Sequence, residues 1–412
     1  MPILVMKFGG TSVADLDRIR NAAEKVRREV ERGYDVIVIV SAMSGKTNEL
    51  VGWVSQTSPL FDAREYDAVV SSGENVTAGL MALTLQEMDI PARSWQGWQV
   101  PLKTTSAHSS ARIQEIPRAN IDQKFAEGMK VAVVAGFQGI SDEGRITTLG
   151  RGGSDTTAVA FAAAFAAERC DIYTDVDGIY TTDPRITKKA RKLEKIAFEE
   201  MLELASLGAK VLQTRSVELA MRYKVRLRVL SSFEETDETS GTLVCDEEEI
   251  MESKVVSGVA YSRDEAKMTL LSVADRPGIA AAIFGPLAHG GINVDMIVQN
   301  VSADGRTDMT FSCPVDQVLR AERAMQEAKE RGEINFGELV QDTEVCKVSV
   351  VGIGMRSHAG VAAKMFEALK AENINIKVIS TSEIKISVLI DRKYMELAVQ
   401  ALHDAFGLDE AA

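Results

Sequence analysis

From about residue 255 onward the chain contains an internal repeat, which constrains its fold more than any other feature. Gly278 aligns with Gly360 and Asn293 with Asn375, both at an offset of 82 residues. Each copy reads as a strand, a glycine-containing loop, a helix, a loop and a second strand. A repeat of this kind indicates two copies of one small α+β unit in the second half of the chain.

The first half of the chain alternates between short apolar runs and segments with helical spacing. The apolar runs predict buried strands over residues 3–7, 36–40, 131–135 and 170–174. Helices are predicted over about residues 19–30, 74–88, 155–168, 198–206 and 210–223. Strands that alternate with helices indicate an α/β fold, with a mostly parallel sheet sandwiched by helices. Ligands of such folds bind beyond the carboxyl ends of the strands.

A polar, acidic stretch around residues 234–249 separates the two halves, and it is interpreted as a linker. The predicted organisation is a first domain over 1–245, a linker over 246–262, and repeat units over 263–340 and 341–412. A chain of 412 residues is too long for one compact core, which agrees with this division.

The composition is that of an ordinary globular protein, but its charge limits the partners it can have. A formal net charge of −13 disfavours binding to nucleic acid or to an anionic membrane. No apolar run approaches the ~18 residues of a membrane span, and the first residues do not resemble a signal peptide. The four cysteines and four histidines are scattered, so no metal site or disulfide is expected. We therefore expect a cytoplasmic protein.

The segment Lys7-Phe-Gly-Gly-Thr-Ser12 directly follows the first predicted strand. Gly9 and Gly10 would let backbone N–H groups approach an anion closely, and Lys7 would add a positive charge. A tight turn with a surface lysine explains the same residues, so this motif alone does not decide the function.

A second glycine-rich loop, Gly150 to Asp155, opens a predicted helix with Ser154 as its expected N-cap. Arg151 can hold a carboxylate or a phosphate through two parallel hydrogen bonds. Asp155 lies in the first turn, where it could orient a lysine or a hydrated Mg²⁺ ion. The alternative for Asp155 is a favourable interaction with the helix dipole alone.

Two other loops carry polar groups suited to a small substrate. The sequence Ser44-Gly-Lys-Thr47 is not a P-loop, because position 40 is valine where that motif needs glycine. The hydroxyl groups of Ser41 and Thr47 remain candidates for contact with phosphate or substrate. Glu74 opens a helix and could pair with the amino group of a substrate.

The segment from Thr174 to Arg185 follows a strand and is rich in turn-forming residues, which suits contact with a nucleotide base. A solvated loop is the alternative interpretation. Lys210 lies at the start of a predicted helix, where a cation is unfavourable for the dipole, and this position hints at an anionic ligand.

The chain shows no Ser–His–Asp or Cys–His arrangement that would indicate nucleophilic catalysis. Phosphoryl transfer to a carboxylate needs no general base, because the nucleophile is already ionised. It needs positioning and charge neutralisation by lysine, arginine and Mg²⁺. The polar residues of the glycine-rich loops meet that requirement.

The motifs together resemble those of the aspartokinases, which have the amino-acid kinase fold. The motifs that carry this resemblance are KFGGTS at 7–12, SAMSGKTN at 41–48, SSGE at 71–74, GRGGSD at 150–155 and TDVDGIYTTDPR at 174–185. The repeat resembles paired ACT domains, which bind small amino acids. The resemblance covers essentially the whole chain and implies ATP and Mg²⁺ as cofactors and L-aspartate as substrate.

The resemblance also implies roles for individual residues. Lys7, Arg151 and Asp155 would be catalytic, and Thr47, Glu74 and Arg151 would hold aspartate. The groups implied around ATP and its phosphates are Lys7, Gly9, Gly10, Ser41, Thr174, Asp175, Tyr180, Arg185 and Lys210. The groups implied in effector binding are Asp275, Gly278, Ile279, Asn293 and Gln299 in the first ACT copy, and Val361, Asn375, Ser382 and Glu383 in the second.

Regulation and assembly are also expected from the resemblance. This short form is similar to aspartokinases inhibited by lysine and threonine together, in which a shorter regulatory subunit often arises from an internal start. Met251 is a candidate start, which would give a heterotetramer; a homo-oligomer with Met251 as an ordinary linker residue is the alternative. The alternatives for function are another carboxylate kinase, such as a glutamate or acetylglutamate kinase, or an amino-acid sensor with an inactive kinase half.

Overall fold

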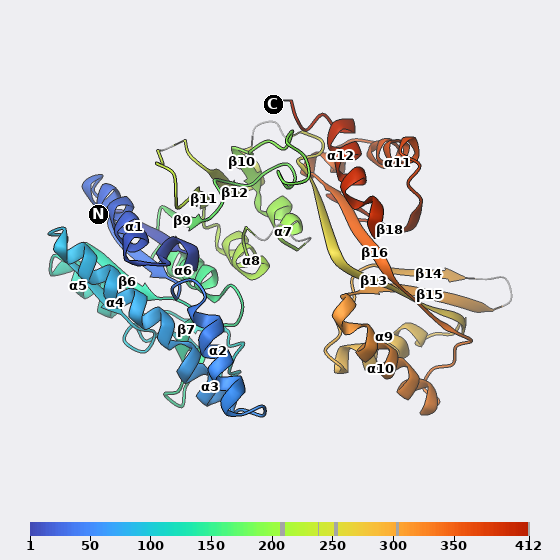
Figure 1. Ribbon diagram of the computed structural model, residues 1–412, viewed down its shortest axis with the longest axis horizontal. Coiled ribbons are helices and arrows are strands. Elements are labelled where there is room, and N and C mark those ends of the chain that lie inside the picture. The colour runs from blue at the N-terminus through green and yellow to red at the C-terminus, as the bar shows by residue number, and fades with distance from the viewer. Residues whose placement is uncertain (207–210, 238, 251–253, 302–304, 411–412) are drawn as a thin grey trace. The chain divides into compact units, whose positions relative to one another are not determined.

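The computed structural model describes all residues except 207–210, 238, 251–253, 302–304 and 411–412. The chain forms two compact units (Figure 1). The N-terminal unit comprises Met1–Ile179, Lys192–Ala205 and Lys210–Met251. The C-terminal unit comprises Tyr180–Arg191, Ser206–Ala209 and Glu252–Ala412.

The N-terminal unit is built on a sheet of eight strands in the order β10-β12-β11-β9-β1-β2-β6-β3. The strands are β1 (Ile3–Phe8), β2 (Asp35–Val40), β3 (Ala92–Trp95), β6 (Val131–Ala135), β9 (Arg169–Thr174), β10 (Lys195–Ala197), β11 (Leu227–Ser231) and β12 (Thr242–Cys245). All neighbouring strands run parallel except β11 and β12. The predicted mostly parallel sheet is therefore confirmed, as are its four predicted strands.

Helices cover this sheet, because its strands are apolar on both sides. They are α1 (Leu16–Glu31), α2 (Lys46–Thr57), α3 (Ala63–Val70), α4 (Ser72–Glu87), α5 (Ala119–Ala126), α6 (Gly153–Ala164), α7 (Phe198–Ser206) and α8 (Thr214–Tyr223), with 3₁₀ turns at Gly10–Val13 and Glu247–Glu249. Helices α1 and α4 lie side by side over one face of the sheet (Figure 1). Helix α6 contacts β1, β2 and β9.

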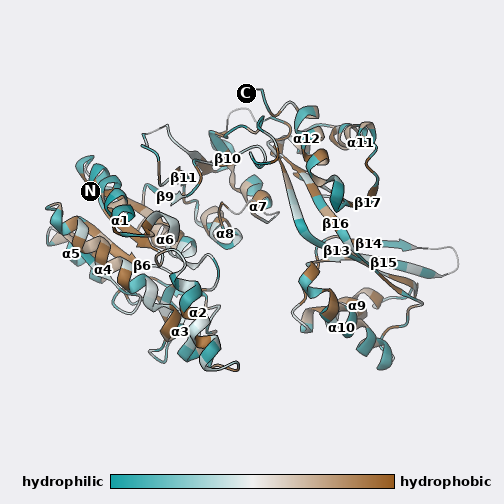
Figure 2. Cartoon of the chain, viewed as in Figure 1, coloured by the Kyte–Doolittle hydropathy of each residue, from teal (hydrophilic) through white to brown (hydrophobic). Residues whose placement is uncertain are grey.

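The alternation of β1 decides which side chains face which helix layer. Leu4, Met6 and Phe8 share one core with α1 and α4. Because side chains alternate along a strand, Lys7 is directed to the opposite face, where α6 packs. Figure 2 shows apolar strands in this sheet and polar residues along the outer turns of α1.

A second, smaller sheet of the N-terminal unit has four strands in the order β5-β4-β7-β8. They are β4 (Lys103–Thr104), β5 (Ile113–Glu115), β7 (Gln138–Ile140) and β8 (Ile146–Thr148). Strands of two or three residues carry too few positions for a periodic pattern, so the sequence did not predict this sheet. Its last strand, β8, leads directly into the glycine-rich loop before α6.

The C-terminal unit contains one sheet of six strands in the order β14-β15-β13-β16-β18-β17, and all of its neighbouring strands are antiparallel. The strands are β13 (Gly258–Ala274), β14 (Ile297–Val301), β15 (Arg306–Cys313), β16 (Leu339–Val351), β17 (Ile376–Thr381) and β18 (Lys385–Asp391). The helices are α9 (Ile279–His289), α10 (Val318–Glu330), α11 (Val361–Ala371) and α12 (Met395–Ala405), with 3₁₀ turns at Val315–Gln317, Ile353–Ser357 and Arg392–Tyr394.

The internal repeat is visible in two separate apolar cores of this unit. One core takes its side chains from α9 and α10 and the other from α11 and α12. The aligned residues Ile279 and Val361 begin equivalent helices, and both are buried. The aligned Gly278 and Gly360 precede them with φ values of +89° and +97°, a conformation that favours glycine. The two α+β units predicted from the repeat are therefore present.

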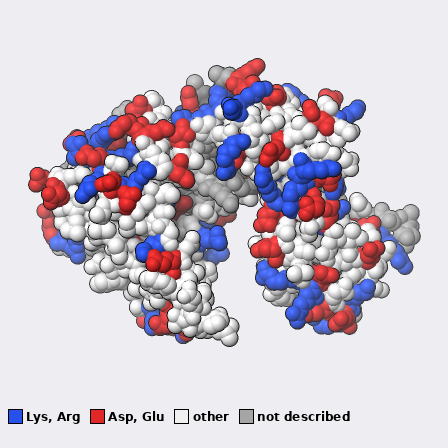
Figure 3. Space-filling model, in the orientation of Figure 1, with Lys and Arg blue, Asp and Glu red and all other residues white. Residues whose placement is uncertain are grey.

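The stretch interpreted as a linker and the segment Tyr180–Arg191 are organised differently from what the sequence suggested. Strand β12 lies inside the acidic stretch interpreted as a linker, and it pairs with β10 and β11. Strand β13 begins at Gly258, within the range 246–262. The segment Tyr180–Arg191 groups with the C-terminal unit, although the chain on both sides of it belongs to the N-terminal unit. On the face shown in Figure 3, acidic and basic side chains are interspersed over both units.

Candidate active site

The candidate site lies where adjacent parallel strands β11, β9, β1 and β2 reach their carboxyl ends. The loops that follow these strands are joined by backbone hydrogen bonds. Gly9 N–H donates to Tyr173 O at 3.2 Å, Ser41 N–H to Phe8 O at 3.1 Å, and Ser232 N–H to Thr174 O at 2.9 Å. This edge of the sheet is where ligands of parallel α/β folds bind.

An ion pair between Lys7 and Asp155 lies at the centre of this edge. Lys7 Nζ is 2.6 Å from Asp155 Oδ1, and the two side chains are only 10% and 11% exposed. Lys7 comes from β1 and Asp155 from the first turn of α6. The aspartate therefore holds the ammonium group beside the positive end of a helix, a combination that favours an anionic ligand.

The turn after β1 requires a residue without a side chain. A β-carbon at Gly10 would lie 3.0 Å from Ala42 O, and one at Gly9 would lie 3.4 Å from Lys7 Nζ. The glycines thus allow the turn to approach the loop after β2 on one side and the lysine ammonium on the other. This arrangement supports the proposed contact of the turn with a phosphate.

The start of α6 differs from the sequence prediction in its cap. Ser154 was predicted as the N-cap, but the N-cap is Gly152 at φ +68°, and Ser154 lies buried in the first turn. The reason is steric, because a β-carbon at position 152 would lie 2.0 Å from Gln213 Cγ. No side chain caps this helix, so its end remains suited to an anion.

Glu74 is a buried carboxylate with a hydrogen-bond partner for only one of its two oxygens among the described residues. It is 3% exposed, and its Oε1 accepts the N–H of Ala42 at 3.1 Å. Its Oε2 is buried without a hydrogen-bond partner among the described residues. Burial raises the pKa of Glu74 to about 7, and the backbone N–H groups of Ala42 and Glu74 lower it in part. A cationic ligand group at Oε2 would relieve this cost.

Ala42 links Glu74 to the glycine turn, because its N–H binds Glu74 and its carbonyl oxygen packs on Gly10. Thr47 lies in the first turn of α2 and is half-buried. The starts of α2 and α4 also enclose a pocket of about 80 Å³. It is lined by Met43, Lys46, Leu50, Ser72, Gly73 and Val76.

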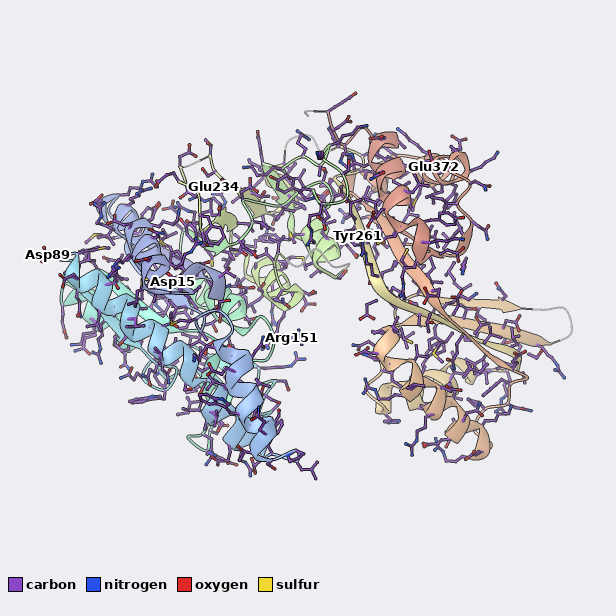
Figure 4. All side chains as sticks on the ribbon, in the orientation of Figure 1. Asp15, Asp89, Arg151, Glu234, Tyr261 and Glu372 are labelled. Atoms are coloured by element: carbon purple, nitrogen blue, oxygen red, sulfur yellow. The ribbon has the colours of Figure 1, made fainter. Side chains whose placement is uncertain are left out.

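The remaining predicted groups of this unit lie at its surface. Arg151 is exposed in the loop before α6 (Figure 4). Ser41 is half-buried at the end of β2. Thr174 Oγ1 donates to Asp175 Oδ1 at 3.2 Å, at the end of β9. The structure therefore brings the predicted Lys7, Gly9, Gly10, Ser41, Glu74, Asp155 and Thr174 to one edge of the sheet.

Three of the residues predicted to contact a nucleotide are not among the described residues of the N-terminal unit. Tyr180 and Arg185 belong to the C-terminal unit, and Lys210 lies outside the described residues. Arg185 binds Asp183 at 2.7 Å, and Asp183 also accepts the hydroxyl of Tyr261 at 2.8 Å. The Arg185 guanidinium is the main cause that lowers the pKa of Asp183 to about 2. Contact of Tyr180, Arg185 and Lys210 with a nucleotide stays a prediction.

A pocket of about 250 Å³ lies in the second copy of the repeat. It is lined by Met355, His358, Gly360, Val361, Ala362, Thr381, Ser382, Glu383 and Ile386. The structure thus brings together three of the four effector residues predicted for this copy. The fourth, Asn375, is exposed and does not line the pocket.

The effector residues predicted for the first copy lie around the start of α9 and along β14. Asp275 and Gly278 are exposed, whereas Ile279 is buried in the core. The N–H of Asn293 donates to Gln317 Oε1 at 2.9 Å. Gln299 is an exposed residue of the edge strand β14, where it pairs with Met309.

Comparison with known protein families now gives the context of these sites. Residues 2–231 match the model of the amino acid kinase family, and residues 267–333 and 348–406 each match an ACT domain model. An aspartate kinase from Pseudomonas putida is 54% identical over 413 aligned residues, covering 100% of this chain and 99% of the relative. An aspartokinase from Corynebacterium glutamicum is 46% identical, with 100% and 98% coverage.

The chain belongs to the aspartokinase family. Its fold is similar to that of aspartokinase III from E. coli, solved with aspartate and ADP in the R-state, at 28% identity and a TM-score of 0.81. That comparison covers 98% of this chain and 99% of the other. The same enzyme with lysine and aspartate in the T-state gives a TM-score of 0.77 over the same shares. Membership in this family makes the chain an enzyme of the kinase class.

The described residues offer neither a membrane-spanning helix nor a metal site made of protein ligands alone. They contain no helix long and apolar enough to cross a membrane. They also contain no group of three or more His, Cys, Asp or Glu side chains that could hold a metal ion by themselves. A Mg²⁺ ion in kinases is usually bound through one or two carboxylates together with the phosphates of the substrate. Asp155 is the carboxylate of this site that fits such a role.

The sequence did not reveal a buried network centred on Asp67 of α3. Its carboxylate accepts hydrogen bonds from His108, Ser109 and Thr148. These residues come from three separate segments and form no motif, so only the folded chain shows that they belong together.

Proposed function

We propose that the protein catalyses the ATP-dependent phosphorylation of the side-chain carboxylate of L-aspartate, giving 4-phospho-L-aspartate and ADP. The observation that carries this proposal is the carboxylate of Glu74, of which only one oxygen has a hydrogen-bond partner among the described residues. That partner, Ala42, also packs on the glycine turn that follows Lys7. An amino-acid substrate supplies the ammonium group that Glu74 Oε2 lacks, and it places its own carboxylate toward the phosphate-binding turn.

The reaction requires only that charges are positioned and neutralised. An oxygen of the aspartate side chain attacks the γ-phosphorus of ATP, the new O–P bond forms, and the bond to the β-phosphate oxygen breaks as ADP leaves. Lys7 neutralises the charge that develops on the transferred group, and Asp155 fixes the position of Lys7. Mg²⁺ bound through Asp155 and the phosphates would supply further neutralisation.

Glu74 and Arg151 define the orientation of the substrate. Glu74 would pair with the ammonium group, and Arg151 would hold a carboxylate through two parallel hydrogen bonds. Thr47, in the first turn of α2, would supply a hydroxyl group to the substrate. The pairing of the two charged groups at separate points fixes the length of substrate that fits, which favours aspartate over longer amino acids.

A substrate panel tests this proposal. ATP-dependent formation of an acyl phosphate is trapped with hydroxylamine, with L-aspartate, L-glutamate and N-acetyl-L-glutamate compared at equal concentration. Turnover with aspartate alone supports the proposal. Turnover with glutamate or N-acetylglutamate but not aspartate would make the protein another carboxylate kinase of this fold.

The ACT domains are proposed to bind lysine and threonine as feedback effectors, so that the enzyme controls the first step of lysine, threonine and methionine biosynthesis. The pocket lined by Val361, Ser382 and Glu383 supports an effector site in the second copy. The E. coli relative solved with lysine also supports an amino-acid effector. Turnover lost only when both amino acids are present would support two cooperating sites.

The effector site proposed for the first ACT copy has its own test. Gln299→Ala is expected to weaken inhibition by at least one of the two amino acids. If inhibition by each of them is unchanged in this variant, the placement of the site near β14 is wrong. The coupling of an effector site to activity is on the order of 1–3 kcal/mol.

The proposed assembly is a heterotetramer with a shorter regulatory subunit that starts at Met251, with a homo-oligomer as the alternative. Met251 lies outside the described residues. Intact-mass measurement of the purified protein, expressed with its own coding sequence, tests this proposal. A short chain that disappears in Met251→Leu supports the internal start, and a single full-length species contradicts it.

A further inference from the structure

Asp67 is a completely buried carboxylate that binds two other segments of the N-terminal unit, the loop of His108 and Ser109 and the end of β8. It lies on α3 and is 0% exposed. His108 Nδ1 lies 2.7 Å from Oδ2, Ser109 N–H donates to both oxygens at 3.0 and 3.1 Å, and Thr148 Oγ1 donates to Oδ1 at 2.6 Å. Such density of hydrogen bonds offsets the desolvation of a buried carboxylate and fixes the partners firmly.

One of these partners is held in a strained conformation. Ser109 has φ +63°, in the left-handed region that costs a non-glycine residue roughly 1–2 kcal/mol. Both carboxylate oxygens of Asp67 accept its N–H, so the carboxylate stabilises this turn together with the backbone hydrogen bond from Ser110 N–H to Ala107 O. The conformation of Ser109 in this turn therefore depends in part on Asp67.

The strained turn packs directly against the loop that carries Arg151. A β-carbon at Gly150 would lie 3.2 Å from Ser109 O, and Ala111 N–H donates to Thr148 O at 2.9 Å. Thr148 is the last residue of β8, three residues before Arg151. Asp67 thus holds both sides of this loop, through Ser109 and through Thr148.

Asp67 is also tied to the helix that carries Glu74. Its backbone oxygen accepts the N–H of Ser71 at 3.1 Å, and α4 begins at the next residue. Gln138 Nε2 donates to Ser71 O at 3.0 Å, which fixes the same junction from β7. Glu74 lies in the first turn of α4, so a single residue connects the supports of Glu74 and Arg151.

We infer that Asp67 is a positioning residue that sets the separation of Glu74 and Arg151 and thereby the selectivity of the site for aspartate over glutamate. This inference rests on the proposed function, because it assigns the ammonium group of the substrate to Glu74 and a carboxylate to Arg151. Loss of the Asp67 network moves the loop of Arg151 relative to α4. The grip on a four-carbon substrate weakens, while the Lys7–Asp155 pair is not touched.

The variant Asp67→Asn tests the inference, because it keeps the volume but places an NH₂ group where a carboxylate oxygen accepts hydrogen bonds. The KM for aspartate is expected to rise about tenfold, equivalent to about 1.4 kcal/mol. The KM for ATP is expected to stay within twofold, and the ratio of kcat/KM for aspartate over glutamate is expected to fall. An unchanged aspartate KM and an unchanged ratio, or an ATP KM that rises in step, would overturn the inference.

Thr148→Val is a second variant, in case Asp67→Asn does not fold. It removes one hydroxyl donor of the network at nearly constant shape. Aspartate KM is expected to rise about threefold, with the ATP KM unchanged; a value within experimental error of the wild type overturns the role of the network.

Asp171→Asn is the matched control for a loss of stability. Asp171 is also 0% exposed, and it binds Arg169 and Arg228 on β9 and β11 instead of the Arg151 loop. Its variant is expected to lower the melting temperature but to leave the aspartate KM within twofold. If it raises the aspartate KM as much as Asp67→Asn does, the effect is a general loosening and the inference fails.

A double variant shows whether Asp67 acts through Arg151. If it does, the aspartate KM of Asp67→Asn/Arg151→Ala stays within twofold of that of Arg151→Ala alone. If the two single substitutions raise the aspartate KM by factors that multiply in the double variant, the inference is overturned. A wild-type protein that does not phosphorylate aspartate would instead contradict the proposed function, so the two failures are distinguishable.

Discussion

Glu74 combines near-complete burial with one carboxylate oxygen that no described group of the protein satisfies. Burial raises its pKa to about 7, so in the free protein it is half protonated near neutral pH. The ionised form attracts a substrate ammonium group and the neutral form does not. If Glu74 binds the substrate ammonium group as proposed, the protonation state of this side chain links the affinity for aspartate to pH.

Aspartate binding is expected to weaken as the pH falls through 7. The aspartate KM of the wild type should be about tenfold higher at pH 6 than at pH 8, because most Glu74 is then protonated. In Glu74→Gln the KM should be high at both pH values and nearly constant between them. Steady-state kinetics at saturating ATP measures the aspartate KM of the two proteins at each pH. A wild-type aspartate KM that does not vary with pH would contradict the role of Glu74.

The same carboxylate is expected to lower the stability of the free protein. Its folded-state pKa lies above its ordinary value of 4.5, so the folded protein retains a proton that the unfolded chain releases between pH 4.5 and 7. Stability is therefore lost as the pH rises through this window, by about 3 kcal/mol in total. Glu74→Gln should be more stable than the wild type. The difference between their free energies of unfolding should increase by about 1 kcal/mol from pH 6 to pH 8.

Urea unfolding at the two pH values measures this gap in the free energy of unfolding. Glu49→Gln provides a control, because Glu49 is an exposed carboxylate of α2 paired with Lys46. Its effect should be small and should not grow with pH. A Glu74→Gln variant less stable than the wild type at pH 8 would show that the carboxylate already has a favourable partner.

Sequence reasoning could find Lys7, Glu74 and Asp155 because each lies in a compact motif beside a predicted strand or helix. It could not find Asp67, whose partners are about 40 and 80 residues away in sequence and share no pattern. It also placed the helix cap at Ser154, because it could not see that Gln213 leaves no room for a side chain at position 152. Both the partners of Asp67 and the N-cap of α6 are determined by contacts between segments distant in sequence, which local propensity does not reveal.

At the scale of elements, the start of α6 is the part of the site with the least steric freedom. Gly152 has φ +68°, and a β-carbon there would lie 2.0 Å from Gln213 Cγ and 2.6 Å from Gln213 Cβ. Position 152 therefore combines a conformation that favours glycine with a close approach of α8. The same turn positions Asp155 for its ion pair with Lys7.

Gly152→Ala is expected to displace the start of α6 and to lower kcat at least tenfold, with a clear loss of stability. Gly144→Ala is the matched control, because its φ of +74° is similar but nothing lies within 4 Å of its added β-carbon. The control should lose about 1 kcal/mol of stability and keep its kcat. Equal loss of kcat in the two variants would contradict a special role of the α6 start.

The long, strongly apolar strands and the helices that follow them could be predicted at the element scale. The four-stranded sheet could not, because its strands contain only two or three residues. The segment Tyr180–Arg191 was also unpredictable. Two contacts tie it to the C-terminal unit. Thr181 Oγ1 lies 2.9 Å from His403 Nε2, and the Tyr261 hydroxyl donates to Asp183 Oδ2. These contacts span between 78 and 222 residues of sequence.

At the scale of the whole molecule, the chain joins a catalytic unit to a unit that carries an amino-acid-sized pocket of about 250 Å³. Glu383 at this pocket is 84% exposed and lies 3.6 Å from Arg356. Its carboxylate is suited to the ammonium group of an effector. If this pocket binds the proposed effector, inhibition requires that the effector favours a less active state of the enzyme.

Glu383→Ala is expected to raise the effector concentration for half-inhibition about tenfold and to leave uninhibited turnover unchanged. The loss of one charge-assisted contact is the physical reason. Glu372→Ala is the matched control, because Glu372 follows α11 (Figure 4) and does not line the pocket. Dose–response curves with lysine, threonine and their mixture measure the effect. Unchanged curves in Glu383→Ala would remove this residue from the effector site.

The most direct test of the central claim compares acyl phosphate formation by the wild type and by Lys7→Ala, with L-aspartate and ATP at saturation. A site that works by charge neutralisation predicts a kcat about 10³-fold lower in the variant, with aspartate affinity within a few-fold of the wild type. Lys25→Ala, which alters a buried lysine of α1 outside the site, should retain turnover. A Lys7→Ala protein that keeps more than a tenth of wild-type turnover would contradict the account.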